Sequence, residues 1–340
     1  MSTEPDPTLP VPAGPVLVTG GAGYVGSLTV RLLQALEVPV VVLDNLSRGH
    51  RAAVTAPLVE ADLGDRAALD QLFRTHRPRS VVHFAALAYV GESVEDPARY
   101  YLSNVHYTWN LLEAMRASGC KEIVFSSTCA TYGNPQRLPI DEEHPQLPIS
   151  PYGRTKLHME HMLADYGGAY GLRHAALRYF NAAGASSDGQ VGEAHDPETH
   201  LIPLVLQTAL GRRREVLVFG DDYDTDDGTC VRDYVHVEDL AEAHVRALAR
   251  LQGESERIVC NLGTGSGHSV REVIDTARSV TGRDIPSRVV ARRPGDPPRL
   301  VSDGRRALAL LGWRARRPEL ASILGDAWRF LLAHPDGYSR

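Results

Sequence analysis

The chain has 340 residues, a formal net charge of −6 and 43% hydrophobic residues. This length and composition predict one large globular domain or two modest ones, and they exclude a largely disordered, collagen-like or coiled-coil protein. The acidic balance lacks the basic footprint of a nucleic-acid-binding protein, so no nucleic-acid partner is expected. No apolar run approaches the ~18–20 residues of a membrane span, so no membrane partner is expected either.

Residues 1–15 contain five prolines and neither the basic nor the apolar segment of a signal peptide. Because proline removes backbone donors from helices and sheets, we expect a flexible N-terminal tail.

The four cysteines, at 120, 129, 230 and 260, lack a C-x-x-C spacing. This pattern predicts reduced, mostly buried thiols in a cytoplasmic protein.

The first predicted elements are an apolar strand at 16–19, a glycine-rich turn, a helix at 27–36 and a strand at 38–43. Further strands are expected at 57–61, 80–85, 122–127 and 173–178, and further helices at 65–75, 100–117 and 152–166. Continuously apolar strands that alternate with helices predict an α/β fold, a Rossmann-type doubly wound parallel sheet covered on both faces.

After residue 180 the alternation weakens, and Gly, Pro, Asp and Arg become more frequent. A helix at 237–250 and a strand at 258–262 could rejoin the sheet. The expected organisation is a cofactor-binding domain over 16–180, rejoined by 236–265, and a smaller, irregular C-terminal substrate lobe over 181–235 and 266–340.

Gly20, Gly23 and Gly26 stand between the first strand and the first helix. This placement is typical of a dinucleotide site, in which glycines shape a tight turn and the helix N-terminus faces the pyrophosphate. Asp44 ends the next strand, where a carboxylate accepts hydrogen bonds from the ribose hydroxyls and repels a 2′-phosphate. The sequence therefore favours NAD, although Arg48 leaves NADP as an alternative.

Tyr152 and Lys156 stand four residues apart on a predicted helix, so their side chains lie on one face. A phenol has a pKa near ~10, and a nearby ammonium group favours its ionised form, which can then accept a proton. Ser126 and Thr128 end the preceding strand, at the carboxyl edge where ligands bind in such sheets. A hydroxyl there can hold the alcohol or ketone that is interconverted.

Three other patterns are ambiguous or weak. Asp62 can meet the adenine edge of the cofactor or cap the helix at 65–75. His158 and His161 have no third ligand nearby, and the acidic run 222–228 has its glycine one position late for a calcium loop. We therefore predict no metal site.

The chain resembles the extended short-chain dehydrogenase/reductase family from about residue 16 to 338. The motifs that carry the resemblance lie at 19–26, 83–93, 126–133, 152–156, 179–181 and 227–236. They are most similar to members that invert C4 of UDP-glucose or UDP-galactose. The resemblance implies tightly held NAD that is reduced and reoxidised within one turnover, Tyr152 as the group that takes the proton from the 4-hydroxyl, Lys156 beside it, and Thr128 on the 4-oxygen.

The resemblance also implies two sets of binding residues. The cofactor set is Gly20, Gly23, Tyr24, Val25, Gly26, Asp44, Asn45, Asp62, Leu63, Phe84, Ala85, Ala86, Asn104, Ser126, Tyr152, Lys156 and Tyr179. The UDP-sugar set is Thr128, Tyr152, Asn181, His200, Leu201, Phe219, Arg232, Arg293, Asp296 and Leu300. This sequence departs from some relatives at Ala88, where they have lysine, at His200, where many have asparagine, and at Leu300, where some have a bulky aromatic residue.

Several alternatives stay open. Leu300 leaves room for UDP-N-acetylhexosamines, and UDP-pentoses or UDP-glucuronate are further possible substrates of a 4-epimerase. A nucleotide-sugar dehydratase would place an Asp-Glu pair after Thr128, where this chain has Cys129 and Ala130. A UDP-glucuronate decarboxylase and a non-catalytic nucleotide sensor are the other two alternatives. The resemblance further suggests a homodimer through helices 100–117 and 152–166.

Overall fold

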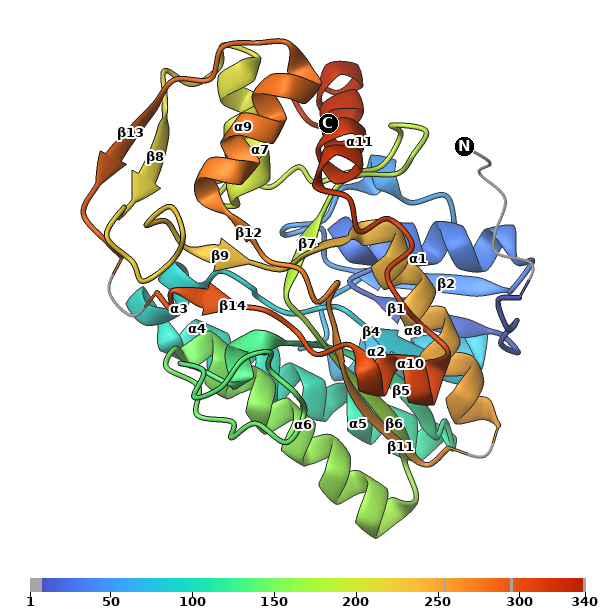
Figure 1. Ribbon diagram of the computed structural model, residues 1–340. Coiled ribbons are helices and arrows are strands. Elements are labelled where there is room, and N and C mark those ends of the chain that lie inside the picture. Colours follow the sequence, from blue (N-terminus) through green and yellow to red (C-terminus); the bar gives the residue numbers. More distant parts are fainter. Residues whose placement is uncertain (1–7, 254, 294–295, 339–340) are drawn as a thin grey trace.

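A computed structural model describes residues 8–253, 255–293 and 296–338. Seven parallel strands form the central sheet, in the order β11-β6-β5-β4-β1-β2-β3 (Figure 1). These strands are β1 (Val16–Thr19), β2 (Val40–Asp44), β3 (Leu58–Glu60), β4 (Ser80–His83), β5 (Glu122–Thr128), β6 (Arg173–Tyr179) and β11 (Arg257–Leu262). Because the strand order reverses between β1 and β4, the ligand crevice of such a sheet lies at the carboxyl ends of these two strands. The predicted doubly wound α/β fold is confirmed.

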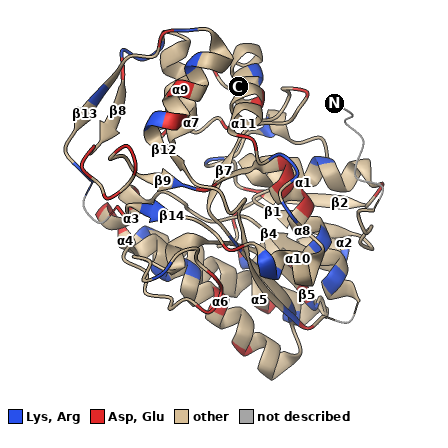
Figure 2. Cartoon of the chain, in the orientation of Figure 1, with Lys and Arg blue, Asp and Glu red and all other residues tan. Residues whose placement is uncertain are grey.

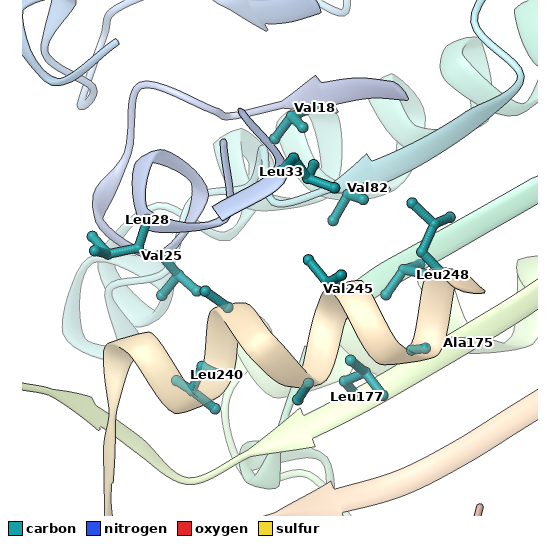
Figure 3. Close-up of a cluster of buried hydrophobic side chains, with 14 of the residues drawn as sticks. Val18, Val25, Leu28, Leu33, Val82, Ala175, Leu177, Leu240, Val245 and Leu248 are labelled. Atoms are coloured by element: carbon teal, nitrogen blue, oxygen red, sulfur yellow. The ribbon is translucent and has the colours of Figure 1, made fainter. Parts of the chain in front are cut away.

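Helices cover both faces of this sheet. They are α1 (Tyr24–Ala35) and α8 (Val237–Gln252) on one face, and α2 (Arg66–His76), α5 (Tyr107–Ser118) and α6 (Pro151–Tyr170) on the other. In β1, Val18 joins the first hydrophobic cluster while its neighbour Leu17 joins the second, as the alternation of side chains along a strand requires. Figure 3 shows the first cluster, where Val245 and Leu248 of α8 pack toward the sheet.

The C-terminal lobe has a hydrophobic core of its own, which is built mainly by helices. They are α7 (Leu201–Ala209), α9 (Val270–Thr281) and α11 (Leu320–Ala333), grouped together in Figure 1. This part of the sequence predicted an irregular lobe, and these three helices were not predicted. A signal for α9 is present, because Ser269 and Glu272 form a capping box at its start.

Short elements complete the fold. The short strands are β7 (Asn181–Ala183), β8 (Val216–Phe219), β9 (Val231–Arg232), β10 (Tyr234–His236), β12 (His268–Ser269), β13 (Ser287–Val290) and β14 (Arg299–Leu300). The short helices are η1 (Arg51–Ala53), α3 (Val90–Glu95), α4 (Pro97–Tyr100), the π-helical η2 (Tyr101–His106), η3 (Cys129–Thr131) and α10 (Arg305–Leu311). The strands β12, β9 and β14 form one small sheet, β7 pairs with β10, and β8 pairs with β13.

Residues 8–15 are anchored to the domain, so the expectation of a flexible tail does not hold for them. Leu9 is only 5% exposed and belongs to the first hydrophobic cluster. The backbone N–H of Ala13 donates to Oε1 of Gln252 at 2.6 Å, and Nε2 of Gln252 donates back to the Ala13 carbonyl at 2.7 Å. Residues 1–7 of the expected tail lie outside the described part of the chain.

Acidic and basic side chains are interspersed over the chain (Figure 2). The acidic loop that follows β8 is paired with basic residues, since Asp222 contacts Arg292 and Asp226 contacts Arg299.

The four cysteines are free and buried, as predicted. Among residues 8–253, 255–293 and 296–338, no helix is both long enough and apolar enough to cross a membrane.

Candidate active site

The glycine turn after β1 is packed too tightly for side chains. Gly20 has a φ of +71°, and a Cβ there would lie 2.5 Å from the backbone nitrogen of Ala85, which follows β4. A Cβ on Gly26 would overlap the carbonyl oxygen of Gly20. Gly23 is the N-cap of α1 and makes no side-chain cap, so the first N–H groups of this helix face the turn. This cradle fits the pyrophosphate of a dinucleotide.

Asp44, the last residue of β2 and the expected ribose ligand, is held by two backbone hydrogen bonds. Its Oδ2 accepts a hydrogen bond from the Ala22 N–H at 3.0 Å, and its Oδ1 accepts one from the Leu46 N–H at 2.8 Å. Burial raises the pKa of this carboxyl group, and the two backbone hydrogen bonds oppose that shift. Because a carboxylate has about four acceptor positions, it retains the capacity to accept two ribose hydroxyls.

Arg48 does not serve the alternative of a 2′-phosphate in this arrangement. Its Nη2 lies 3.0 Å from Oε1 of Glu92, and its Nη1 donates to the carbonyl of Asp196 at 2.8 Å. The guanidinium group also stacks 4.8 Å from the centre of the Tyr89 ring. With its charge paired elsewhere, Arg48 leaves the Asp44 carboxylate as the dominant charge at the end of β2, which favours NAD over NADP.

Asp44→Asn is expected to weaken NAD binding by about 10- to 100-fold, because the amide keeps one acceptor and loses the charge. The same change removes the repulsion of a 2′-phosphate, so the ratio of NADP to NAD affinity should rise. Isothermal titration calorimetry with both cofactors measures this. Asp65→Asn is the matched control, since Asp65 caps α2 by accepting the Ala68 N–H at 3.0 Å. An unchanged affinity ratio in Asp44→Asn would contradict the assignment.

Asp62 does not cap the following helix, so that alternative is wrong; Asp65 is the N-cap of α2. Instead, Oδ2 of Asp62 accepts a hydrogen bond from Nδ2 of Asn45 at 2.5 Å, and its Oδ1 accepts one from the Gly64 N–H at 2.7 Å. These contacts bring the ends of β2 and β3 together beside Asp44. The role of Asn45 and Asp62 in binding adenosine stays a prediction.

Tyr152, Lys156 and Thr128 meet at the carboxyl end of β5. Tyr152 lies in the first turn of α6, which Ser150 caps by accepting the Gly153 N–H at 3.1 Å. The Thr128 hydroxyl, at the end of β5, lies close enough to the Tyr152 phenol to lower its pKa. Nζ of Lys156 donates to the carbonyl of Ser126 at 2.9 Å and is buried. The predicted catalytic residues are therefore neighbours.

Burial shifts the pKa values of this pair in opposite directions. It raises the pKa of the Tyr152 phenol well above its usual value, and the hydrogen bond from Thr128 opposes this. It lowers the pKa of Lys156 to about 7, against the attraction of the Glu160 carboxylate. Both shifts favour neutral groups in the protein alone. A further positive charge beside the phenol, such as an oxidised nicotinamide ring, favours the phenolate that accepts a proton.

One turn after Lys156 on α6, Glu160 forms a buried ion pair that was not predicted from the sequence. Glu160 stands one helical turn after Lys156, and Nη2 of Arg178 on β6 lies 2.6 Å from its Oε2. Both side chains are 7% exposed or less. Arg178 also donates to the Tyr132 hydroxyl at 2.9 Å, and Tyr132 donates to Oδ1 of Asn261 at 2.6 Å. The i, i+4 spacing of Lys156 and Glu160 places Glu160 on the face of α6 that Lys156 shares, but it does not indicate Arg178 as the partner.

Tyr179 and Asn104 lie close to the catalytic group. The Tyr179 hydroxyl is 2.7 Å from Oγ of Ser126. Asn104, in the π-helical η2, donates through Nδ2 to the carbonyl of Leu87 at 3.0 Å and to Oγ1 of Thr155 at 3.1 Å. Asn104 thus ties the segment after β4 to α6. Its contact with the cofactor stays a prediction.

The other expected cofactor residues follow the ends of β1, β3 and β4. The N–H groups of Phe84 and Ala85 donate to the carbonyl of Thr19 at 2.9 and 3.1 Å, which holds the ends of β1 and β4 together. The Tyr24 hydroxyl donates to the carbonyl of Gly184 at 2.6 Å. The remaining members of this set are Val25 in α1, Leu63 after β3 and Ala86 after β4.

Several expected UDP-sugar residues lie on or after the short strands β8, β9 and β14. The guanidinium group of Arg293 lies 3.9 Å from the centre of the Phe219 ring, at the end of β8. Arg232 on β9 forms an ion pair with Asp296 and is the register partner of Leu300 on β14. An aromatic ring stacked on a guanidinium group suits a uracil base, and arginine forks suit a diphosphate.

Two further parts of the UDP-sugar set come from the elements around these strands. Nδ2 of Asn181, the first residue of β7, donates to the carbonyl of Asp233 at 3.1 Å. His200 is the N-cap residue of α7, and Leu201 begins that helix. Leu300 packs against the hydrophobic cluster that contains Cys129. That cluster adjoins Thr128, so Leu300 lies close to the catalytic group.

The chain matches the model of the NAD dependent epimerase/dehydratase family over residues 16–263. The UDP-glucose 4-epimerase of Halalkalibacterium halodurans is 49% identical over 325 residues, which cover 95% of this chain and 97% of that one. The crystal structure of UDP-glucose 4-epimerase from Brucella ovis in complex with NAD has a TM-score of 0.90 and 53% identity, and the match covers 92% of this chain and 97% of that one. The enzyme from Stenotrophomonas maltophila, with bound NAD and formylated UDP-arabinopyranose, has a TM-score of 0.91 and 42% identity, with 94% and 98% covered. This chain therefore belongs to the NAD dependent epimerase/dehydratase family.

Proposed function

We propose that this chain inverts C4 of UDP-glucose and UDP-galactose with NAD as its cofactor, through a transient 4-keto sugar. The observation that carries this function is the position of the Tyr152 phenol beside Thr128, with buried Lys156 one turn later on α6, at the carboxyl edge of a dinucleotide-binding sheet. Relatives with about half of their residues identical are UDP-glucose 4-epimerases.

The residues around the glycine turn fit NAD. The cradle of Gly20 and Gly26 has no room for side chains, and α1 presents its N-terminus there. The Asp44 carboxylate receives two backbone N–H groups and has acceptor capacity left for a ribose. Bound NAD supplies the redox chemistry, a reversible removal of the C4 hydrogen with its electron pair.

The catalytic residues move and hold a proton. The phenolate of Tyr152 accepts the proton of the sugar 4-hydroxyl as the carbonyl forms, and it returns this proton when C4 is reduced from the other side. The ammonium group of Lys156 stabilises the phenolate between these steps. The Thr128 hydroxyl, which contacts the phenol, holds the 4-oxygen in line with it.

Inversion requires tight binding of UDP and rotational freedom for the sugar. We assign the binding of UDP to Arg232 and Arg293, whose forked donors suit a diphosphate, and to Phe219, whose ring suits uracil. Asp296 holds Arg232 in an ion pair and thereby orients it. The sugar end faces short or aliphatic side chains such as Leu300, which leave the 4-keto sugar free to turn over.

Product analysis tests the function. The purified protein is incubated, without added NAD, with UDP-galactose, UDP-N-acetylgalactosamine, UDP-arabinose or UDP-glucuronate, and the products are identified by NMR. The proposal predicts UDP-glucose from UDP-galactose. A 4-keto-6-deoxy product would make the chain a dehydratase, loss of CO₂ from UDP-glucuronate would make it a decarboxylase, and the absence of turnover would support a nucleotide sensor.

Leu300→Tyr is expected to reduce turnover of UDP-N-acetylgalactosamine selectively. The tyrosine ring would take up space that the acetamido group needs. Such overcrowding costs about 1–3 kcal/mol, which corresponds to a roughly 5- to 150-fold lower kcat/KM. UDP-galactose lacks the acetamido group, so its turnover should change less. Leu300→Met keeps the volume and is the control. Equal losses for both sugars in Leu300→Tyr would show that Leu300 does not limit sugar size.

The homodimer and the cytoplasmic location also stay proposals. Exposed apolar side chains on η2 and α5, namely Tyr101, Leu102 and Trp109, support a dimer through these helices. Measuring the molecular mass of the protein in solution tests this dimer. Four free buried thiols are consistent with a reducing compartment.

A further inference from the structure

The loop between β7 and α7 places four candidate metal ligands within eight residues. They are Glu193, His195, Glu198 and His200, and their ligand atoms all lie within 4.8 Å of one another. Nδ1 of His195 is 3.0 Å from Oε1 of Glu193 and 3.8 Å from Oε2 of Glu198. Nδ1 of His200 is 3.7 Å from Oε1 of Glu198. In a tetrahedral site with bonds of ~2.0–2.2 Å, ligand atoms stand about 3.3 Å apart, so these four side chains can surround one ion.

The burial of this cluster also points to a cation. The side chains of Glu193 and Glu198 are each only 6% exposed, and two buried carboxylates side by side need positive charge. Within the described ranges, both carboxylates form ion pairs with the two imidazole rings. Nδ1 of His195 is buried and makes no hydrogen bond, although it points at the two carboxylates. Glu198 also accepts the N–H groups of Thr199 and His200, and Glu193 contacts the His200 ring. An ion at the centre of the four side chains would give His195 Nδ1 a partner and place positive charge between the two carboxylates.

We propose that Glu193, His195, Glu198 and His200 bind one divalent transition-metal ion, for which Zn²⁺ is the best match. Two imidazole nitrogens and two carboxylate oxygens are suitable zinc ligands, whereas Mg²⁺ and Ca²⁺ prefer six or more oxygen ligands. Four protein ligands close the coordination sphere, as in structural sites. The ion therefore has no part in the chemistry at Tyr152.

The position of the cluster indicates what the ion would stabilise. The yellow-green connection from β7 to α7 in Figure 1 crosses toward α1 and is held there at three points. Tyr24 donates to the carbonyl of Gly184, the His50 ring is 2.7 Å from the carbonyl of Ala194, and Arg48 donates to the carbonyl of Asp196. His195 also lines a small pocket beside Gly23, at the N-terminus of α1. The ion would fix the loop against the glycine turn.

Sequence inspection missed this site because it sought cysteine pairs and helical histidine pairs. The signal is the spacing Glu-x-His-x-x-Glu-x-His over residues 193–200. All four ligands lie in one short segment, so closing the loop around an ion costs little chain entropy.

The test is direct metal binding. The protein is stripped with EDTA, reloaded with ZnCl₂ and passed through a desalting column, and its metal content is measured by mass spectrometry; calorimetry with ZnCl₂ gives the Kd. We expect one Zn²⁺ per chain and at least a 100-fold weaker Kd in Glu193→Gln/His195→Gln. The matched control is His158→Gln/His161→Gln, which removes two exposed histidines on α6 and should leave binding unchanged. His200 is left intact because it also belongs to the expected UDP-sugar set.

A second variant guards against misfolding. Glu198→Gln alone should weaken Zn²⁺ binding by at least 10-fold while the circular dichroism spectrum stays that of the parent. Zn²⁺ should raise the melting temperature of the parent and not that of Glu193→Gln/His195→Gln. Zn²⁺ binding that survives in both ligand variants, loss of binding in the α6 control, or no binding by the parent would each overturn the proposal. Equal competition by Mg²⁺ would overturn the assignment to a transition metal.

Discussion

Tyr152→Phe is expected to lower kcat for UDP-galactose by about 10²- to 10⁴-fold, the usual contribution of a positioned acid–base group. The substitution removes only the hydroxyl beside Thr128 and keeps the half-buried ring in place. The KM for UDP-galactose should change much less, because the main grip on the substrate is assigned to UDP. Steady-state kinetics with a coupled assay for UDP-glucose measure both constants.

Tyr166→Phe is the matched control for that experiment. Tyr166 lies on the same helix, but its hydroxyl donates to Oε1 of Glu113 at 2.7 Å, away from the catalytic group. Its removal should leave kcat within about twofold of the parent, because no step at C4 uses that hydroxyl. If Tyr152→Phe retained more than a tenth of the parent kcat, the proton-transfer role of Tyr152 would be wrong.

Arg178→Met is expected to lower the free energy of unfolding by about 3–5 kcal/mol, since it leaves the Glu160 carboxylate buried without its partner. Three of the Arg178 nitrogens contact Glu160 or Tyr132, so the substitution also removes hydrogen bonds one helical turn from Lys156. Urea denaturation followed by circular dichroism measures the loss.

Two controls separate the cost of a stranded buried charge from the cost of losing any ion pair. Glu160→Gln/Arg178→Met removes the stranded charge and should recover part of the loss. Arg66→Met breaks the i, i+4 pair of Arg66 with Asp70, in which the side chains are 39% and 37% exposed, and should cost less than about 0.5 kcal/mol. Losses of equal size in Arg66→Met and Arg178→Met would contradict the importance of the buried pair.

The parts of the fold that the sequence predicted best are those in which local pattern and tertiary context agree. Strand β1 was predicted with its observed bounds, because three apolar residues and Thr19 precede the glycine turn and all four are buried. Helices α7, α9 and α11 were missed because they lie in a part of the chain rich in Gly, Pro and Arg, where their apolar faces serve a small separate core. The π-helical start of the predicted helix at 100–117 has no signal in hydrophobic periodicity.

The site shows the same limit. The proximity of Tyr152, Lys156 and Thr128 follows from the rule that parallel strands end at one edge, so it was predictable. The ion pair of Arg232 with Asp296 joins residues 64 positions apart and depends on how β9 and the segment before β14 pack. The pairing of Glu160 with Arg178 likewise needs the register of α6 against β6. Such contacts are tertiary, and no local spacing encodes them.

The fate of the hydrogen at C4 tests the central claim most directly. UDP-galactose that carries deuterium at C4 is incubated with the purified protein, and the UDP-glucose formed is analysed by NMR and mass spectrometry. The account predicts inversion at C4 with the deuterium retained on that carbon, because Tyr152 exchanges only the hydroxyl proton. Loss of the deuterium to solvent, or a product that is not inverted at C4, would contradict it.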